Sequence, residues 1–218
     1  MLFELPPLPY PYDALAPTMD ELTVRIHHDK HHGHYVAGLN AALEGSEWAE
    51  RDLGQLLAGL DMMPEENRDA VRTNGGAHAN HSLFWETMAP DGGMGPAGPL
   101  RDAIEVTFQS VPELKRQVNA AGNAFVGSGW VWLVYDGRGL AVTSTAREDS
   151  PLMNGHLPLL GVDLWEHAYN FKYQDRRDDY LEAWWYVVDW RRVGERYATA
   201  TGQDHNGKRL DHGEEGQE

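Results

Sequence analysis

The feature that most limits how this chain can fold is a run of glycine and proline near its middle. In the ten residues from Pro90 to Pro99, these two residue types occupy seven positions. Proline lacks a backbone N–H, and glycine loses more conformational freedom on ordering than any other residue, so regular helix or strand is not expected to continue through this run. We therefore expect a domain boundary here, with one domain over residues 1–90 and a second over residues 91–200.

The residues before this boundary contain one extended segment and two helical patterns. The arm from Pro6 to Pro17 is rich in proline, which removes hydrogen-bond donors and disfavours helix in the residue before it. Apolar residues at steps of three and four predict one long helix from Met19 to Glu44 and a second from about Asn67 to Met88. We expect the arm to lie across an antiparallel hairpin of two long helices.

The residues after the boundary change from a helical to a strand-like period. Helices are expected from about Leu100 and again from Ser110. Apolar runs then predict a small antiparallel sheet of three strands at Trp130–Tyr135, Leu140–Thr145 and Leu157–Leu164. A final helix is predicted from Tyr180 to about Ala198, and residues 201–218, rich in glycine and charge, are expected to form a disordered tail. The fold class is therefore α+β, with the helical hairpin domain followed by an α/β domain.

Composition excludes several classes of partner and chemistry. With 34 acidic and 18 basic residues the chain has a net charge of −16, which argues against nucleic acid and against an anionic membrane surface as partners. No apolar run approaches the ~18 residues of a membrane span, and the N-terminal sequence lacks the basic and apolar segments of a leader, so a cytoplasmic protein is expected. The absence of cysteine excludes disulfides, thiolate ligands and thiol nucleophiles.

Histidine is concentrated in one short stretch. Five of the eleven histidines lie between Ile26 and Tyr35. On a helix, His27, His31 and Tyr35 stand four residues apart and line one face, so two imidazoles and a phenol point at the same neighbouring element. The alternative to a metal site is a solvated or partly buried histidine-rich helix, and this stretch alone does not separate the two.

Two further motifs contain groups that bind metals. His78 and His81 stand three apart on the second predicted helix, and either could turn inward, although a lone histidine on such a face is more often a core residue. Asp163 and His167 lie at the end of the third predicted strand, where a site is readily assembled. With one histidine from each helix they would supply three imidazole nitrogens and one carboxylate oxygen. Such a set suits manganese or iron at least as well as zinc and leaves a position for water or substrate.

Several motifs, taken in order along the chain, resemble those of the iron/manganese superoxide dismutases. They are Leu5–Asp13, Ile26–Tyr35, His78–Trp85, Gly127–Trp130 and Asp163–Tyr169. The resemblance extends from about Leu5 to Tyr197. It implies an enzyme that converts superoxide to dioxygen and hydrogen peroxide by cycling one manganese ion per subunit, or an iron ion, between the trivalent and divalent states. It also implies a homodimer or a homotetramer.

The same resemblance implies roles for individual residues. The implied metal ligands are His27, His81, Asp163 and His167. The implied catalytic residues are Tyr35 and His31 at the substrate channel and Glu148 near the ion. Lys30 and Arg177 would steer the anionic substrate despite the net charge of the chain. The aromatic shell would consist of Trp85, Trp130 and Trp165, for which plain core packing is the alternative. Glu166 would lie at the subunit interface, together with Asn170.

The chain departs from the pattern of this family at three places. Glu148 stands where the manganese type has a glutamine, and an ionised carboxylate would only accept hydrogen bonds, whereas a carboxyl kept protonated by burial would donate one. Asn170 replaces a common interface tyrosine, and the loop from Pro151 to Asp163 is shorter than in many relatives. Ala77 is small, like the glycine usual in the manganese type, which favours manganese over iron.

Two other functions are compatible with parts of the sequence. A non-haem iron oxygenase uses two histidines and one carboxylate, although a fourth protein ligand argues against it. A non-catalytic metal-binding or interaction protein could keep the same scaffold, given the unusual residues at positions 148 and 170.

Overall fold

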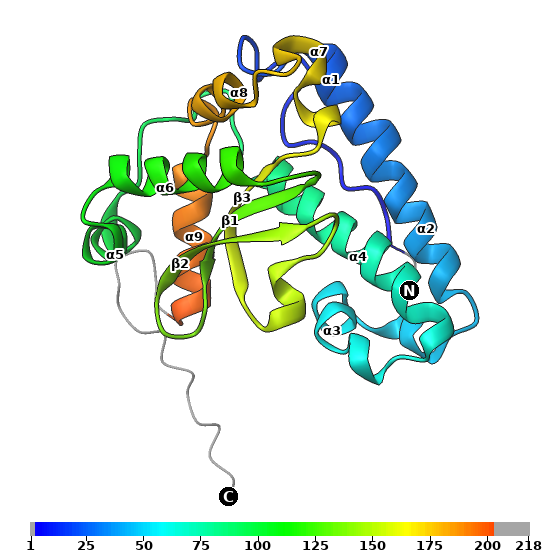
Figure 1. The fold of residues 1–218 in the computed structure, drawn as a ribbon. Helices are drawn as coiled ribbons and strands as arrows, with labels where there is room; N and C mark the ends of the chain where they lie inside the picture. The colour runs from blue at the N-terminus through cyan, green and yellow to red at the C-terminus, as the bar shows by residue number, and fades with distance from the viewer. Residues whose placement is uncertain (1–2, 203–218) are drawn as a thin grey trace, which may run out of the picture.

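The computed structural model describes residues 3–202, which form a helical hairpin packed against a three-stranded sheet and its helices (Figure 1). The first long helix runs continuously through α1 (Glu21–Ile26), a π-helical segment η1 (His27–His32) and α2 (Gly33–Leu43). It begins after Asp20, whose carboxylate accepts a hydrogen bond from the Thr23 backbone N–H at 2.9 Å. The prediction of one long helix here is confirmed, although the π-helical segment within it was not predicted.

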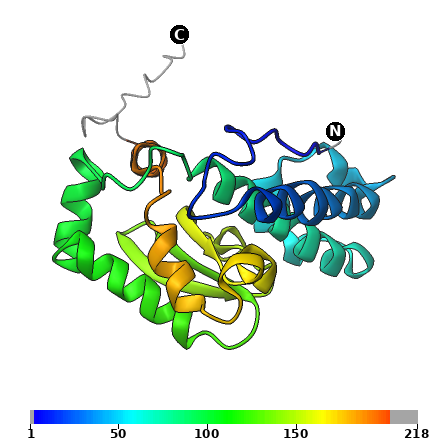
Figure 2. The same cartoon turned by 90° about the horizontal axis from the view of Figure 1, so that it is seen from above.

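The second long helix, α4 (Glu65–Glu86), packs along α2 and completes the hairpin, as predicted (Figure 2). The connection between them contains short elements that periodicity did not indicate. These are the 3₁₀ turn η2 (Glu47–Glu50), helix α3 (Leu53–Ala58) and the 3₁₀ turn η3 (Leu60–Met62). Their apolar side chains fill a small core between α2 and α4, which includes Trp48 and Leu56.

The sheet has the predicted three antiparallel strands. They are β1 (Gly129–Tyr135), β2 (Leu140–Ala146) and β3 (Leu157–Asp163), in the order β2–β1–β3. The register pairs Trp130 of the central strand with Asp163 at the end of β3. Helices α5 (Gly98–Phe108) and α6 (Val111–Ala124) begin close to the predicted positions and lie away from the hairpin, with α6 against β1 and β2 (Figure 2).

The prediction of one helix from Tyr180 to Ala198 is wrong. The chain forms two helices here, α8 (Arg177–Trp184) and α9 (Trp190–Thr201). The segment between them pairs with the glycine-rich linker instead: Ala89 N–H donates to the Val187 carbonyl at 2.8 Å, and Gly93 N–H donates to Val188 at 2.9 Å. Asp189 then caps α9. A long-range backbone pairing therefore overrides a local helical pattern.

Three short elements complete the described chain. They are the 3₁₀ turn η4 (Pro151–Asn154), the 3₁₀ turn η5 (Glu166–Ala168) and helix α7 (Asn170–Tyr173). The predicted tail lies outside the described residues, except for its first two residues. None of the helices in residues 3–202 combines the length and hydropathy that a membrane span requires.

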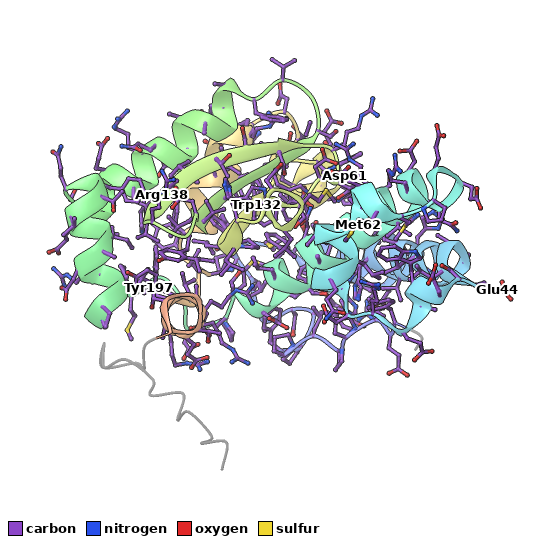
Figure 3. The ribbon with its side chains drawn as sticks, turned by 90° about the horizontal axis from the view of Figure 1, so that it is seen from below. Glu44, Asp61, Met62, Trp132, Arg138 and Tyr197 are labelled. Carbon is purple, nitrogen blue, oxygen red and sulfur yellow. The ribbon has the colours of Figure 1, made fainter. Side chains whose placement is uncertain are left out.

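The larger core contains side chains from both sides of the glycine-rich linker. Phe84 and Trp85 of α4 pack in one cluster with Trp130 and Trp132 of β1. Figure 3 shows Trp132 deep among the side chains, whereas Glu44 lies at the far end of the hairpin. The division into domains at residue 90 stays a prediction, but this shared core brings α4 and the end of the sheet together.

Candidate metal centre

Four residues from four different elements converge at the contact between the hairpin and the sheet. His27, His81, Asp163 and His167 each offer one donor atom, and these atoms all lie within 4.8 Å of one another. They come from the first residue of η1, from α4, from the end of β3 and from η5. The structure thus brings together the four residues that the family resemblance implies as ligands. It adds a fourth protein donor to the three that a typical non-haem iron oxygenase uses.

Hydrogen bonds to neighbouring atoms orient these donors. His81 Nδ1 lies 2.7 Å from the Ala77 carbonyl oxygen, so this nitrogen carries the proton and Nε2 presents its lone pair to the centre. Asp163 Oδ1 accepts from the Trp165 backbone N–H at 2.8 Å, which leaves Oδ2 facing the histidines. From Oδ2, the Nε2 atoms of His27, His167 and His81 lie at 3.1, 3.3 and 3.8 Å.

A metal ion fits this arrangement because, within residues 3–202, the donor atoms of the four residues have no hydrogen-bond partner outside the group. His27, His81 and Asp163 have no exposed side-chain surface, and His27 Nδ1 and Nε2 and His81 Nε2 are buried without a hydrogen-bond partner. Buried polar atoms are normally paired, so the unpaired Nε2 atoms of His27 and His81, both close to Asp163 Oδ2, indicate a ligand. Three imidazoles and one carboxylate, without any thiolate, suit manganese or iron.

The buried histidines are neutral and Asp163 is ionised, which are the protonation states that a metal cation requires of its ligands. Burial lowers the pKa of His27 to about 4, assisted by repulsion from His167, and lowers the pKa of His81 well below its ordinary value. Both imidazoles are therefore neutral at pH 7. Burial opposes the charge of Asp163, but interactions with the His167 and His27 imidazoles outweigh it and hold the pKa of that carboxyl below its ordinary value.

Aromatic rings enclose the centre. The Trp85 ring lies 4.8 Å from the His27 ring, and the Trp130 ring lies 5.1 Å from the His81 ring. Trp165 stacks on His167 at 5.6 Å. Trp85 and Trp130 also belong to the larger core, so each of them both packs in the core and encloses the centre. Phe84, 5.7 Å from His27, is a wall residue that sequence reasoning missed, although it directly precedes Trp85.

Tyr35 and His31 lie between the buried donors and the surface. The His31 ring stacks on His167 at 4.3 Å, and the Tyr35 ring lies 5.6 Å from His81. Both side chains are half-buried. The face that His27, His31 and Tyr35 were predicted to share is therefore directed at the centre, despite the π-helical turn.

Glu148 is a buried acid beside these residues. Only 3% of its surface is exposed. Tyr35 donates its hydroxyl hydrogen to Glu148 Oε1 at 2.7 Å, and Trp130 Nε1–H donates to Oε2 at 3.4 Å. Burial, together with the nearby charge of Asp163, raises the pKa of Glu148 to about 7.

The position of Glu148 follows from contacts of its backbone. The preceding Arg147 has φ of +54°, a left-handed conformation that turns the chain inward after β2. Gly76 of α4 leaves space for this turn, because a Cβ there would overlap the Glu148 carbonyl oxygen. Asn80 Nδ2 donates to the carbonyl oxygens of Glu148 and Asp149, each at 3.2 Å. Gly76 and Asn80 therefore support the position of Glu148, a role that the sequence did not indicate for either residue.

The remaining candidates lie farther out. Lys30, Glu166 and Asn170 are exposed. Arg177 is half-buried and donates mainly to backbone carbonyls, including Phe125 at 2.8 Å. Its guanidinium also donates to Gly122, Gly127, Leu164 and the Tyr169 hydroxyl. This residue holds several loops together, a structural contribution that its charge alone did not indicate.

A second histidine pair lies behind the centre. His32 Nε2 and His78 Nδ1 are 2.7 Å apart, and both side chains are buried. Of the two histidines on α4, His81 faces the four-residue centre, whereas His78 pairs with His32. The dense histidine stretch was the available signal for this pair, but which side chains meet is defined only in the folded chain.

Comparisons with known proteins agree with this geometry. Residues 2–89 match the alpha-hairpin domain of the iron/manganese superoxide dismutases, and residues 96–196 match the C-terminal domain of the same family. A manganese superoxide dismutase of Pseudomonas aeruginosa is 52% identical over 197 residues, which cover 90% of this chain and 97% of the relative. A manganese superoxide dismutase of Listeria innocua is 48% identical over 201 residues, 92% of this chain and 100% of the relative.

Two independent matches therefore cover the two halves of the chain, and the similarity to whole relatives spans the residues that build the centre. The chain belongs to the iron/manganese superoxide dismutase family.

Proposed function

We propose that this chain converts superoxide to dioxygen and hydrogen peroxide at one manganese ion per subunit, with iron as the alternative ion. His27, His81, Asp163 and His167 would hold the ion. The observation that carries the proposal is the convergence of these four donors, with unpaired buried nitrogens, in a chain about half identical to manganese superoxide dismutases. When bound, manganese supplies a one-electron change between its trivalent and divalent states.

The residues around the ion keep water out and hold the donors in place. Trp85 and Trp130 are buried against the histidine rings, so the donors meet the ion in a surrounding of low polarity where electrostatic attraction is strong. The fixed tautomer of His81 and the single free oxygen of Asp163 mean that little rearrangement is needed when the ion binds.

Tyr35 and His31 are proposed to line the path of superoxide. Burial and the nearby charge of Glu148 raise the pKa of the Tyr35 phenol above its ordinary value, so the hydroxyl keeps its proton at neutral pH. That proton points at Glu148 Oε1, and the phenol oxygen is left as an acceptor toward the path. Glu148 therefore sets the orientation of the hydroxyl. The two protons of each peroxide molecule come from solvent through this half-buried side.

Lys30 and Arg177 are proposed to attract the anionic substrate. Superoxide approaches a chain with a net charge of −16, so local positive charge must outweigh the general repulsion. Arg177 has a fixed position because backbone carbonyls hold its guanidinium. Lys30 is exposed on the π-helical segment that starts at His27.

The proposal extends to assembly and location. We propose a homodimer or homotetramer with Glu166 and Asn170 in the interface, since both are exposed close to His167 in the chain and the adjacent Phe171 leaves 59% of its surface exposed. Sedimentation of the purified protein would measure the assembly. A cytoplasmic location is proposed as well, and fractionation of the native cells tests it.

A single experiment tests the function. Full-length protein is purified, its manganese and iron contents are measured by elemental analysis, and the same samples are assayed for superoxide consumption. We expect activity to follow the manganese content. His81→Gln should lose most of the metal and the activity, whereas His156→Gln, a histidine outside the centre, should keep both. Protein that binds manganese stoichiometrically without consuming superoxide would contradict the proposal.

A further inference from the structure

The Glu148 carboxylate has no lysine or arginine partner among residues 3–202. Within the same residues, no lysine or arginine side chain forms an ion pair with Asp163. The contacts of the Glu148 carboxylate are two neutral donors, the Tyr35 hydroxyl and the Trp130 indole N–H. A buried carboxylate with neutral partners alone is costly, because hydrogen bonds replace only part of its lost hydration.

Glu148 is also outside the set of ligands. The four donor atoms that converge within 4.8 Å belong to the three histidines and Asp163. Both oxygens of Glu148 already accept hydrogen bonds from Tyr35 and Trp130, and the indole nitrogen can only donate. The side chains of Tyr35 and Trp130, whose rings pack against His81, therefore lie between this carboxylate and the four donor atoms.

The backbone prevents this charge from leaving the site. Asn80 holds the carbonyl oxygens of Glu148 and Asp149, and Arg72 forms a 2.6 Å ion pair with Asp149. Gly76 allows the loop to pack directly on α4. Three contacts from one helix thus hold the segment in place, so solvent cannot easily rehydrate the carboxylate.

We propose that Glu148 strengthens retention of the metal ion by supplying a second buried negative charge that the ion balances, without itself being a ligand. The inference rests on the proposed function. Three ligands are neutral imidazoles, so Asp163 and Glu148 together supply two negative charges against the two positive charges of a divalent ion. In a region of low dielectric, a charge one layer away still interacts strongly with the ion. Glu148 is thus a charge-balancing residue of the centre.

Glu148→Gln isolates the charge. The amide has nearly the same shape, its oxygen can accept from Trp130, and its NH₂ group can donate to the Tyr35 oxygen. The number of hydrogen bonds is therefore kept while one negative charge is removed. The matched control is Glu44→Gln, the same chemical change at an exposed position at the far end of the hairpin (Figure 3).

The experiment measures how tightly the full-length, manganese-loaded protein keeps its ion. Wild type and both variants are equilibrated with a series of concentrations of a competing chelator at pH 7.5, and the retained manganese is measured by elemental analysis. We expect the apparent Kd for manganese to rise about tenfold in the Glu148→Gln variant, which corresponds to about 1.4 kcal/mol. The Glu44→Gln control should stay within threefold of wild type.

Each outcome decides the question. A rise of less than threefold for Glu148→Gln, or an equal rise for Glu44→Gln, overturns the inference. Failure of Glu148→Gln to fold without metal also overturns it, because the inference makes the carboxylate unfavourable in the empty site. The proposed function fails separately, if wild-type protein loaded with manganese does not consume superoxide.

Discussion

Replacing Glu148 by glutamine should make the metal-free protein more stable at neutral pH, even though it weakens retention of the ion. The reason is the cost of an ionised carboxylate that is 3% exposed and, in the described part of the chain, hydrogen-bonds only with the neutral Tyr35 and Trp130 side chains. In the unfolded chain, the same group is hydrated and titrates at its ordinary pKa of 4.5. In the folded chain, burial and Asp163 raise that pKa to about 7.

The sign of the pH dependence follows from proton binding. Between pH 4.5 and 7, the folded state holds more of this proton than the unfolded state, so the contribution of Glu148 to the free energy of unfolding falls as pH rises. The pKa of Glu148 rises from 4.5 in the unfolded chain to about 7 in the folded chain. At about 1.36 kcal/mol per pKa unit, ionised Glu148 therefore lowers the free energy of unfolding by at most about 3 kcal/mol above pH 7. Glutamine does not titrate and avoids this loss.

Urea unfolding of metal-free wild type, Glu148→Gln and Glu44→Gln at several pH values between 5 and 8 provides the measurement. The difference between Glu148→Gln and wild type should shift by about 2–3 kcal/mol in favour of the variant across this range. The difference for Glu44→Gln should stay nearly constant. A constant difference for Glu148→Gln would refute the reasoning, because it would mean that the folded protein compensates the charge of Glu148 by some other contact.

Three further predictions follow from contacts around the centre. Gly76→Ala should reduce the free energy of unfolding by about 1–3 kcal/mol and weaken manganese retention, because the added Cβ would overlap the Glu148 carbonyl oxygen. In the control variant Gly75→Ala, the added Cβ would meet only side-chain atoms at 3.3 Å or more. Equal effects of the two substitutions in denaturant titrations would contradict this account. Arg177→Gln should lower the free energy of unfolding by about 1–3 kcal/mol, because hydrogen bonds to backbone carbonyls are lost. The control Arg176→Gln removes only an exposed ion pair with Asp179 and should cost well under 1 kcal/mol. Thermal unfolding of both variants and of wild type measures the difference. The rate of superoxide consumption per manganese should fall as ionic strength rises, and Lys30→Gln should make that fall less steep; a rate independent of salt would exclude steering by these charges.

Local patterns accounted for most of the architecture. The glycine and proline residues from Pro90 to Pro99 separate the hairpin from the following helices and sheet because their backbones do not favour continued regular structure. The uninterrupted apolar runs of β1 and β3 identify strands because both faces of these strands are buried. Such signals need only neighbouring residues, and they failed where distant backbone intervened. Residues 185–189 read as helix, yet they pair with the linker and separate α8 from α9.

The amino-acid sequence by itself determined which chemical groups are available for the centre: histidines at helical spacing, an aspartate and a histidine at the end of a strand, and no thiolate. Only the tertiary structure decided that His81 faces the centre while His78 pairs with His32, and that Tyr35 donates to Glu148. Residue type sets what a side chain can bind, and it is encoded locally. Distance, burial and charge state arise when segments separated by many residues pack together and exclude water, so they become defined only in the folded chain.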